Sequence, residues 1–203
     1  MAAGTLQSLT TTTGLNELNE RLGDVSSFYH EGTKSLPEIR QLIKEEIESD
    51  PRLSGIKIRT TPGLHGGYFP GRDTIALGVT NPAVVAHELG HAKNLRNSKL
   101  YSRLLMAANN VNKLNNTVAL PAMLAIRALI KDKDTRDEVL NILTGISAIT
   151  AAPGLTEELS ASLDAVKHAP NKLRAIKALL PAFIHHSLAA AVPIGTYQLG
   201  KHI

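Results

Sequence analysis

Residues 81–95 of this 203-residue chain read NPAVVAHELGHAKNL. Asn81 followed by Pro82 is a typical helix start, because Asn caps free backbone N–H groups and proline suits the first helical position. On such a helix His87 and His91 lie four residues apart and therefore on one face. Two imidazoles placed in this way can both reach one zinc ion at about 2.0–2.1 Å. Glu88 lies beside the first imidazole, where it can accept a proton from a zinc-bound water.

The five-residue pattern alone is only moderately specific. From the His and Glu content of the chain, a chance occurrence is expected in roughly one or two such sequences per hundred. The surrounding residues favour a metal site, because they give the helix an apolar face and small side chains for close packing. These residues are Val84, Val85, Ala86, Leu89, Gly90 and Ala92.

A catalytic zinc needs a third protein ligand. A metzincin would carry Gly at position 94 and His at position 97, but both positions hold asparagine, so that class is excluded. A gluzincin takes a glutamate from a later helix, and LTEELSAS at residues 155–162 offers Glu157 and Glu158. On a helix that starts at Thr156 these neighbours lie about 100° apart, so only one can point squarely at the metal. Alternatively, both are first-turn acids favoured by the helix dipole.

A longer stretch, LHGGYFPGRDTIALGVTNPAVVAHELGHAKN at residues 64–94, resembles the YugP-like neutral zinc metallopeptidases. These are relatives of the HtpX proteases and the CAAX-prenyl endopeptidases. The resemblance spans about residues 35–168, and its specific parts are Tyr-x-Pro at 68–70, the helix motif at 86–92 and E-x-x-A-S at 158–162. The family usually has Asp-His before the tyrosine, where this chain has Gly66-Gly67. The hydrophobic helices of the family are also longer.

The resemblance implies a zinc-dependent metalloendopeptidase that binds one Zn2+ per chain and acts on a peptide or protein substrate. It implies Glu158 as the third ligand beside His87 and His91, with Glu88 as the catalytic base. Glu157 is then expected to point toward solvent. The implied fold is zincin-like: the active-site helix lies beside a short edge strand, and a hydrophobic helical hairpin follows. We expect the strand near residues 74–79 to be this edge strand and to pair with the substrate.

The remaining pattern predicts a mainly α fold with a small β-sheet, in the α+β class. Aromatic residues reach only 3%, and the Leu, Ala, Ile and Val that supply the apolar content favour helices. SLPE at residues 35–38 has the form of a capping box, and Asp50-Pro51 ends the helix that follows. Alternation of apolar and polar residues predicts strands near residues 56–59 and 74–79. From Ser98 onward we expect helices, with breaks near residues 131–138, 153–154 and 170–171.

Composition excludes several function classes. Without cysteine the chain has no disulfide, thiol nucleophile or thiolate metal site. The net charge of +4 comes from scattered basic residues without interleaved aromatics, which argues against a nucleic-acid groove. Residues 1–30 are predicted to be a polar tail without a secretory signal, and residues 31–203 a single metallopeptidase domain. These features indicate a cytoplasmic or membrane-associated protein and do not indicate its oligomeric state.

Three apolar stretches, at residues 118–130, 139–152 and 178–199, leave two interpretations open. The first two are shorter than the ~20 residues of a membrane span, and prolines and histidines dilute the third. Buried helices of a helical core are the preferred interpretation, and membrane association is the alternative. Two functional alternatives follow: a non-catalytic relative within a larger assembly, and a membrane-interacting protein that keeps the zinc site.

Overall fold

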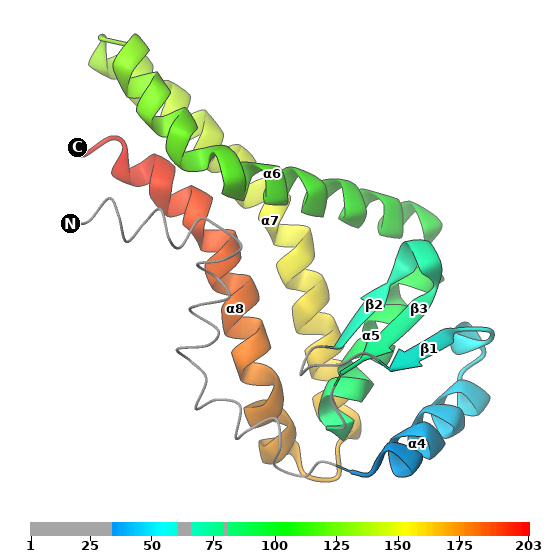
Figure 1. The fold of residues 1–203 in the computed structure, drawn as a ribbon. Helices are drawn as coiled ribbons and strands as arrows, with labels where there is room; N and C mark the ends of the chain where they lie inside the picture. Colours follow the sequence, from blue (N-terminus) through cyan, green and yellow to red (C-terminus); the bar gives the residue numbers. More distant parts are fainter. Residues whose placement is uncertain (1–33, 61–65, 79–80) are drawn as a thin grey trace. The chain divides into compact units, whose positions relative to one another are not determined.

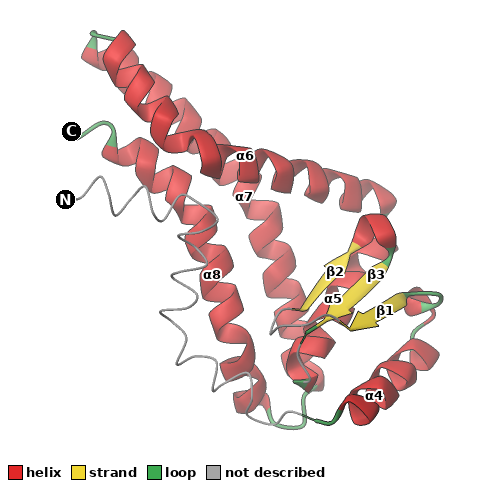
Figure 2. Ribbon diagram, in the orientation of Figure 1, coloured by secondary structure: helices red, strands yellow, loops and turns green. Residues whose placement is uncertain are grey.

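The structure is a computed structural model that describes residues 34–60, 66–78 and 81–203. Figures 1 and 2 show that helices predominate and that the three strands form one small sheet. The predicted α+β class with mainly helical content is therefore confirmed. In chain order the elements are α4 (Leu36–Ser49), the 3-10 turn η2 (Pro51–Leu53), β1 (Lys57–Thr60), β2 (Gly66–Phe69), the 3-10 turn η3 (Pro70–Arg72), β3 (Thr74–Leu77), α5 (Pro82–Asn97), α6 (Lys99–Leu129), α7 (Lys133–His168) and α8 (Lys172–Leu199).

The sheet has the strand order β1-β3-β2, with β1 parallel and β2 antiparallel to β3. β3 is therefore the central strand. The expectation that the strand near residues 74–79 lies at an edge is wrong, because β1 and β2 pair with both of its sides. The edge strand that contacts α5 is β2.

Side-chain caps fix where α4 and α5 begin. The Ser35 backbone N–H and hydroxyl both donate to Glu38 at 2.8 and 2.7 Å, as the capping-box pattern predicts. At the start of α5, the Asn81 side chain accepts a hydrogen bond from the Ala83 N–H at 2.9 Å. The predicted starts of both helices are therefore confirmed.

One face of α5 is buried against the sheet and α4. Val85 and Leu89 of α5 pack in a cluster with Ile39 and Ile43 of α4 and Ile75 of β3. Because helix side chains repeat at three- and four-residue steps, this packing directs His87, Glu88 and His91 away from that cluster. The hydrophobic core thus fixes the orientation of the motif.

The α7 helix runs without interruption from Lys133 to His168 and includes Pro153 and Gly154. The predicted break at residues 153–154 is therefore wrong. A proline inside a helix removes one hydrogen bond but does not always end the helix. As a consequence, Glu157 and Glu158 lie in the body of a long helix, and the first-turn dipole explanation for them no longer applies.

The chain divides into two compact units. One contains Thr156–Phe183 and the described part of Gly23–Leu104, and it holds all the predicted site residues. The other contains Leu105–Leu155 and Ile184–Ile203. The predicted tail at residues 1–30 lies outside the described residues, so its boundary with a domain at 31–203 stays a prediction.

The unit with Leu105–Leu155 and Ile184–Ile203 has an apolar cluster of its own, with polar side chains beside it. The Tyr197 hydroxyl donates to Asn115 at 2.8 Å, and Asn115 donates to Ser147. The apolar cluster consists of Ala119, Met123, Leu140 and Tyr197.

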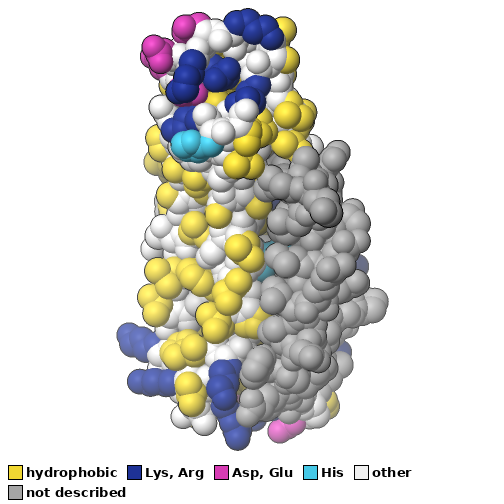
Figure 3. Space-filling model, turned by 90° about the vertical axis from the view of Figure 1, so that its left-hand side faces the viewer, with side chains coloured by type: hydrophobic (Ala, Val, Ile, Leu, Met, Phe, Trp, Pro, Cys, Tyr) yellow, Lys and Arg dark blue, Asp and Glu magenta, His cyan; other side chains and the backbone are white. Residues whose placement is uncertain are grey.

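Large apolar side chains are exposed over much of the face shown in Figure 3. Both α7 and α8 are long and apolar enough to cross a membrane by length and composition. In their most apolar 18-residue windows, only 17% and 22% of the residues are buried. The expectation of buried core helices is therefore not met for these two stretches, because the described elements cover only part of their apolar surface.

Candidate metal site

Three of the predicted residues come together in the structure. The ligand atoms of His87, His91 and Glu158 all lie within 4.8 Å of one another. The two histidine Nε2 atoms are 3.0 Å apart, and Glu158 Oε2 lies 3.3 Å from His87 Nε2 and 3.6 Å from His91 Nε2. A tetrahedral ion with bonds of about 2.05 Å would separate its ligand atoms by about 3.3 Å. The group could therefore hold a metal ion without large rearrangement.

The donor set limits which metals suit this site. Two imidazoles and one carboxylate suit zinc, and by the same criteria they suit other first-row divalent metals. Three protein ligands leave a fourth position for water, which is the arrangement of catalytic rather than structural zinc sites.

Small residues allow α7 to approach α5 closely enough to deliver Glu158. A Cβ atom added to Gly90 would lie only 3.1 Å from the Ala161 Cα. Ala92 and Ala165 are also buried, and Ala165 packs against Val84 of α5. The close contact at Gly90 therefore sets the distance between the histidines and the third ligand.

Glu88 lies beside the three ligand atoms and is only 7% exposed. The edge strand β2 covers it: the Tyr68 backbone N–H donates to its carboxylate, and a Cβ on Gly66 would lie 3.3 Å from its Cγ and Oε1 atoms. Burial raises the pKa of Glu88, while the charges of His91 and His87 oppose the rise. A carboxylate with a raised pKa holds a proton more readily, which suits a general base.

Glu157 is 4% exposed, so the expectation that it points toward solvent is wrong. Its carboxylate accepts hydrogen bonds from His91 Nδ1 at 3.1 Å, Asn94 Nδ2 at 3.2 Å and the Tyr101 hydroxyl at 3.1 Å. The physical reason is the continuity of α7, which brings this part of the helix against α5 and the start of α6. Glu157 is thus a buried acid directly behind one of the imidazoles.

The two histidines differ in the groups that their Nδ1 atoms contact. His91 Nδ1 contacts Glu157, whereas His87 Nδ1 lies 3.2 Å from the Ser162 hydroxyl oxygen. Burial lowers the pKa of His91, but its hydrogen bonds to the carboxylates of Glu157 and Glu158 and the charges of Glu158 and Glu88 outweigh burial and raise it to about 10.

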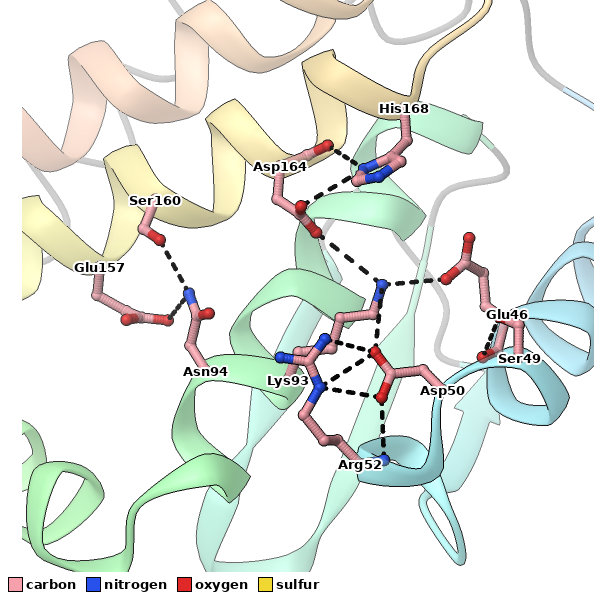
Figure 4. Close-up of polar contacts among 10 residues, drawn as sticks. All are labelled: Glu46, Ser49, Asp50, Arg52, Lys93, Asn94, Glu157, Ser160, Asp164 and His168. Atoms are coloured by element: carbon pink, nitrogen blue, oxygen red, sulfur yellow. Dashed lines mark hydrogen bonds and ion pairs between the residues drawn. The ribbon is translucent and has the colours of Figure 1, made fainter.

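A polar cluster next to the site joins α4, α5 and α7 (Figure 4). Lys93 of α5 donates to Glu46 at 3.0 Å and lies 3.9 Å from both Asp50 and Asp164. Beside it, Asn94 contacts Glu157 and Ser160 of α7. The residues that follow His91 on α5 therefore tie this helix to its neighbours.

Sequence reasoning did not assign roles to Asn94, Tyr101, Ser162 and Lys93. Helical spacing could have indicated two of them, because Asn94 lies three residues after His91 and Ser162 lies four after Glu158. No comparable signal marks Tyr101, because its contact with Glu157 joins residues 56 positions apart.

Comparison of the chain with family models, curated proteins and solved structures finds no match.

Proposed function

We propose that this protein is a zinc-dependent metalloendopeptidase with a zincin-like fold, of the YugP-like kind. In this proposal one zinc is held by His87, His91 and Glu158. The hydrolysis of a peptide bond then depends on Glu88 as the base.

One observation carries the proposal: a buried carboxylate adjoins a three-ligand group whose spacing suits a tetrahedral metal. Glu88 follows His87 directly on α5, and its carboxylate is covered by the edge of β2. A metal site built only for structure needs four protein ligands and no neighbouring base. Among the described residues three ligands meet at this point, and three ligands beside a carboxylate with a raised pKa favour catalysis over a structural role.

The side chains of the site suggest how the reaction would proceed. When bound, zinc polarises the scissile carbonyl and lowers the pKa of its water to about 7. Glu88 would accept a proton from the attacking water and pass it to the departing amine. Because β2 is an edge strand beside Glu88, it is the strand that can pair with an extended peptide next to the base. This assignment replaces the strand near residues 74–79 as the substrate-binding strand.

The Glu88→Gln variant tests the catalytic part of the proposal. It removes the base and keeps the size of the side chain, so zinc content and melting temperature should stay near those of the wild type. Peptide hydrolysis should fall by about 10²–10⁴-fold. Glu48→Gln, on an exposed residue of α4, is the matched control and should leave hydrolysis unchanged. Equal cleavage by Glu88→Gln and the wild type would contradict the mechanism, and a wild type that binds zinc but cleaves no peptide would favour the non-catalytic relative.

The Glu158→Ala variant tests the third ligand. We expect a loss of zinc affinity of about 10-fold or more, since a direct ligand should matter at least as much as the groups behind it. His87→Ala and His91→Ala should lose zinc in the same measurement. Glu138→Ala, an exposed acid on the same helix, is the control and should keep full zinc content. Full zinc occupancy in Glu158→Ala would exclude this residue as a ligand.

Exposed apolar helices favour a second property, which is attachment to a membrane. Residues 139–156 and 178–200 contain no Asp, Glu, Lys or Arg. As helices these runs are about 27 and 35 Å long, which brackets the ~30 Å thickness of a bilayer hydrocarbon core. We therefore propose that α7 and α8 bring the enzyme to a lipid bilayer, which is the membrane-associated form of the protein.

A further inference from the structure

Glu157 is the buried acid of the site to which the proposed reaction gives no role. It adjoins Glu158 in sequence, but its carboxylate lies on the other side of the His91 ring: Glu158 contacts Nε2 at 3.6 Å and Glu157 contacts Nδ1 at 3.1 Å. The two nitrogens of an imidazole face in different directions. Glu157 therefore cannot bind the same metal ion that His91 binds through Nε2.

The position of Glu157 determines which nitrogen of His91 is free to bind a metal. A carboxylate that accepts a hydrogen bond from Nδ1 keeps the proton on that atom, so the lone pair resides on Nε2. Nε2 is the atom that faces His87 and Glu158. The contact also prevents rotation of the ring, because both ends of the imidazole are occupied.

Two further side chains hold the carboxylate in place. Asn94 donates to Oε1, the oxygen that also contacts His91, and Tyr101 donates to Oε2. These donors come from α5 and α6, while Glu157 itself is on α7. Three donors satisfy a carboxylate that is only 4% exposed, so its charge is stabilised where it meets the ring.

Within the described part of the chain, the partner of His87 Nδ1 is the neutral hydroxyl of Ser162 and not a carboxylate. The two metal-binding imidazoles are thus supported unequally by residues of one segment of α7. A carboxylate makes an imidazole more basic and a stronger ligand than a hydroxyl does.

We propose that Glu157 is a positioning residue that holds the Nδ1–H of His91, so that Nε2 is directed at the metal. This inference rests on the proposed metal site. It assigns the adjacent glutamates Glu157 and Glu158 different tasks, one behind the ring and one at the metal.

The test compares Glu157→Gln with Glu157→Ala. Glutamine keeps the size of the side chain and an oxygen that can accept from His91, so metal-free Glu157→Gln should melt near the wild type. Its zinc affinity, measured by competition with a chelator, should still fall by about 10-fold, and that of Glu157→Ala by up to about 100-fold. In proton NMR spectra of the zinc-loaded protein, the His91 Nδ1–H signal should shift upfield in Glu157→Gln, because the charged acceptor is gone.

The matched control is Ser160→Ala, which removes a contact with Asn94 on the same stretch of α7 and leaves the His91–Glu157 hydrogen bond in place. It should keep zinc affinity and the Nδ1–H signal close to those of the wild type. Glu157→Asp is the second variant if Glu157→Gln does not fold, and it should also weaken zinc binding because its shorter side chain withdraws from Nδ1.

The possible outcomes separate this inference from the metal site itself. If His87→Ala loses zinc while Glu157→Gln binds it like the wild type, the positioning role is wrong and the metal site stands. If His87→Ala also keeps full affinity, the metal site is wrong. A lowered melting temperature of metal-free Glu157→Gln with unchanged zinc affinity would assign Glu157 to helix packing alone and overturn the proposal.

Discussion

At the scale of single residues, Gly66 shows how closely the backbone of β2 approaches the Glu88 side chain. Gly66 is the first residue of β2 and faces the Glu88 side chain. A Cβ atom at residue 66 would press on the carboxylate, so the glycine leaves room for it in this position. In the proposed function, placement of the base therefore depends on this glycine.

We predict that Gly66→Ala displaces Glu88 without removing the metal. The added Cβ would lie 3.3 Å from Cγ and Oε1 of Glu88, a distance at which the carboxylate must shift. Peptide hydrolysis should fall about 10-fold or more, because a small misplacement of a catalytic group is costly, and zinc content should stay constant. Gly71→Ala is the control, since nothing lies within 4 Å of its added Cβ. Equal hydrolysis rates for the two variants would show that Glu88 is not held as described.

The motif residues could be predicted from the sequence and Glu157 could not. His87 and His91 need only the four-residue repeat of a helix to share a face. The burial of Glu157 depends on α5 and α6, and on a helix that passes through Pro153. Local rules treat an acid near a proline as a first-turn residue, so they assigned Glu157 to solvent. Glu158 was preferred through family resemblance, and the structure places it next to both histidines.

At the scale of elements, the close packing of α5 on α7 brings the proposed ligands together. The contact is narrowest at Gly90, which meets the backbone of Ala161. Gly90 lies between the two histidines on α5, and Ala161 lies three residues after Glu158 on α7. If α5 and α7 were further apart, metal binding should therefore be weaker, while the sheet should stay intact.

We predict that Gly90→Ala destabilises the protein by about 1–3 kcal/mol and weakens zinc binding, because the added methyl group overpacks this contact. Chemical denaturation and chelator competition measure the two effects. Gly145→Ala is the control on α7: its added Cβ meets nothing within 4 Å, so it should be neutral or stabilising by up to about 1 kcal/mol. Unchanged zinc affinity in Gly90→Ala would show that the helices can separate without cost to the site.

A second element-scale prediction concerns Asp50, which ends α4. Hydrogen bonds from the Arg52 side chain and backbone, with the charges of Arg52 and Lys93, outweigh burial and lower the pKa of Asp50 from 3.8 to about 2. A lowered pKa in the folded state stabilises the protein above pH 3.8, and this stabilisation is lost as the pH falls toward 2. Urea unfolding should therefore show a smaller loss over this range in Asp50→Asn than in the wild type. Asp134→Asn, on an exposed acid, should behave like the wild type, and identical curves for all three proteins would contradict the prediction.

Elements with local signals were predicted well. The capping box at Ser35 and the Asn-Pro start of α5 are side-chain patterns with direct backbone partners, and strands expected at 56–59 and 74–79 appear at Lys57–Thr60 and Thr74–Leu77. The order of the strands was not predictable, because it depends on pairing between segments separated in the chain. For this reason β3 was expected at an edge and lies in the centre.

At the scale of the whole molecule, the exposed apolar surface of α7 and α8 predicts that the protein is attached to a membrane. Residues 139–156 and 178–200 lack charged side chains, and their helices are mostly unburied. We expect the full chain to remain with the membrane fraction after alkaline carbonate washing and to need detergent for extraction. Ile149→Asp, on a highly exposed residue of α7, should weaken this attachment because a charge in a bilayer is costly. Lys44→Asp, on α4, is the control and should stay attached like the wild type. Quantitative recovery of the wild type in the soluble fraction without detergent would exclude the attachment.

The distance along the chain between the proposed ligands gives the metal a role in folding. His91 lies 66 positions before Glu157, and Glu157 directly precedes Glu158 in the chain. A metal bound by His91 and Glu158 would therefore act as a cross-link that closes a long loop. The loop-closure entropy removed from the unfolded chain corresponds to about 4 kcal/mol. During synthesis the histidine pair emerges long before the glutamate, so the nascent chain carries two of the three proposed ligands until α6 and most of α7 have been made.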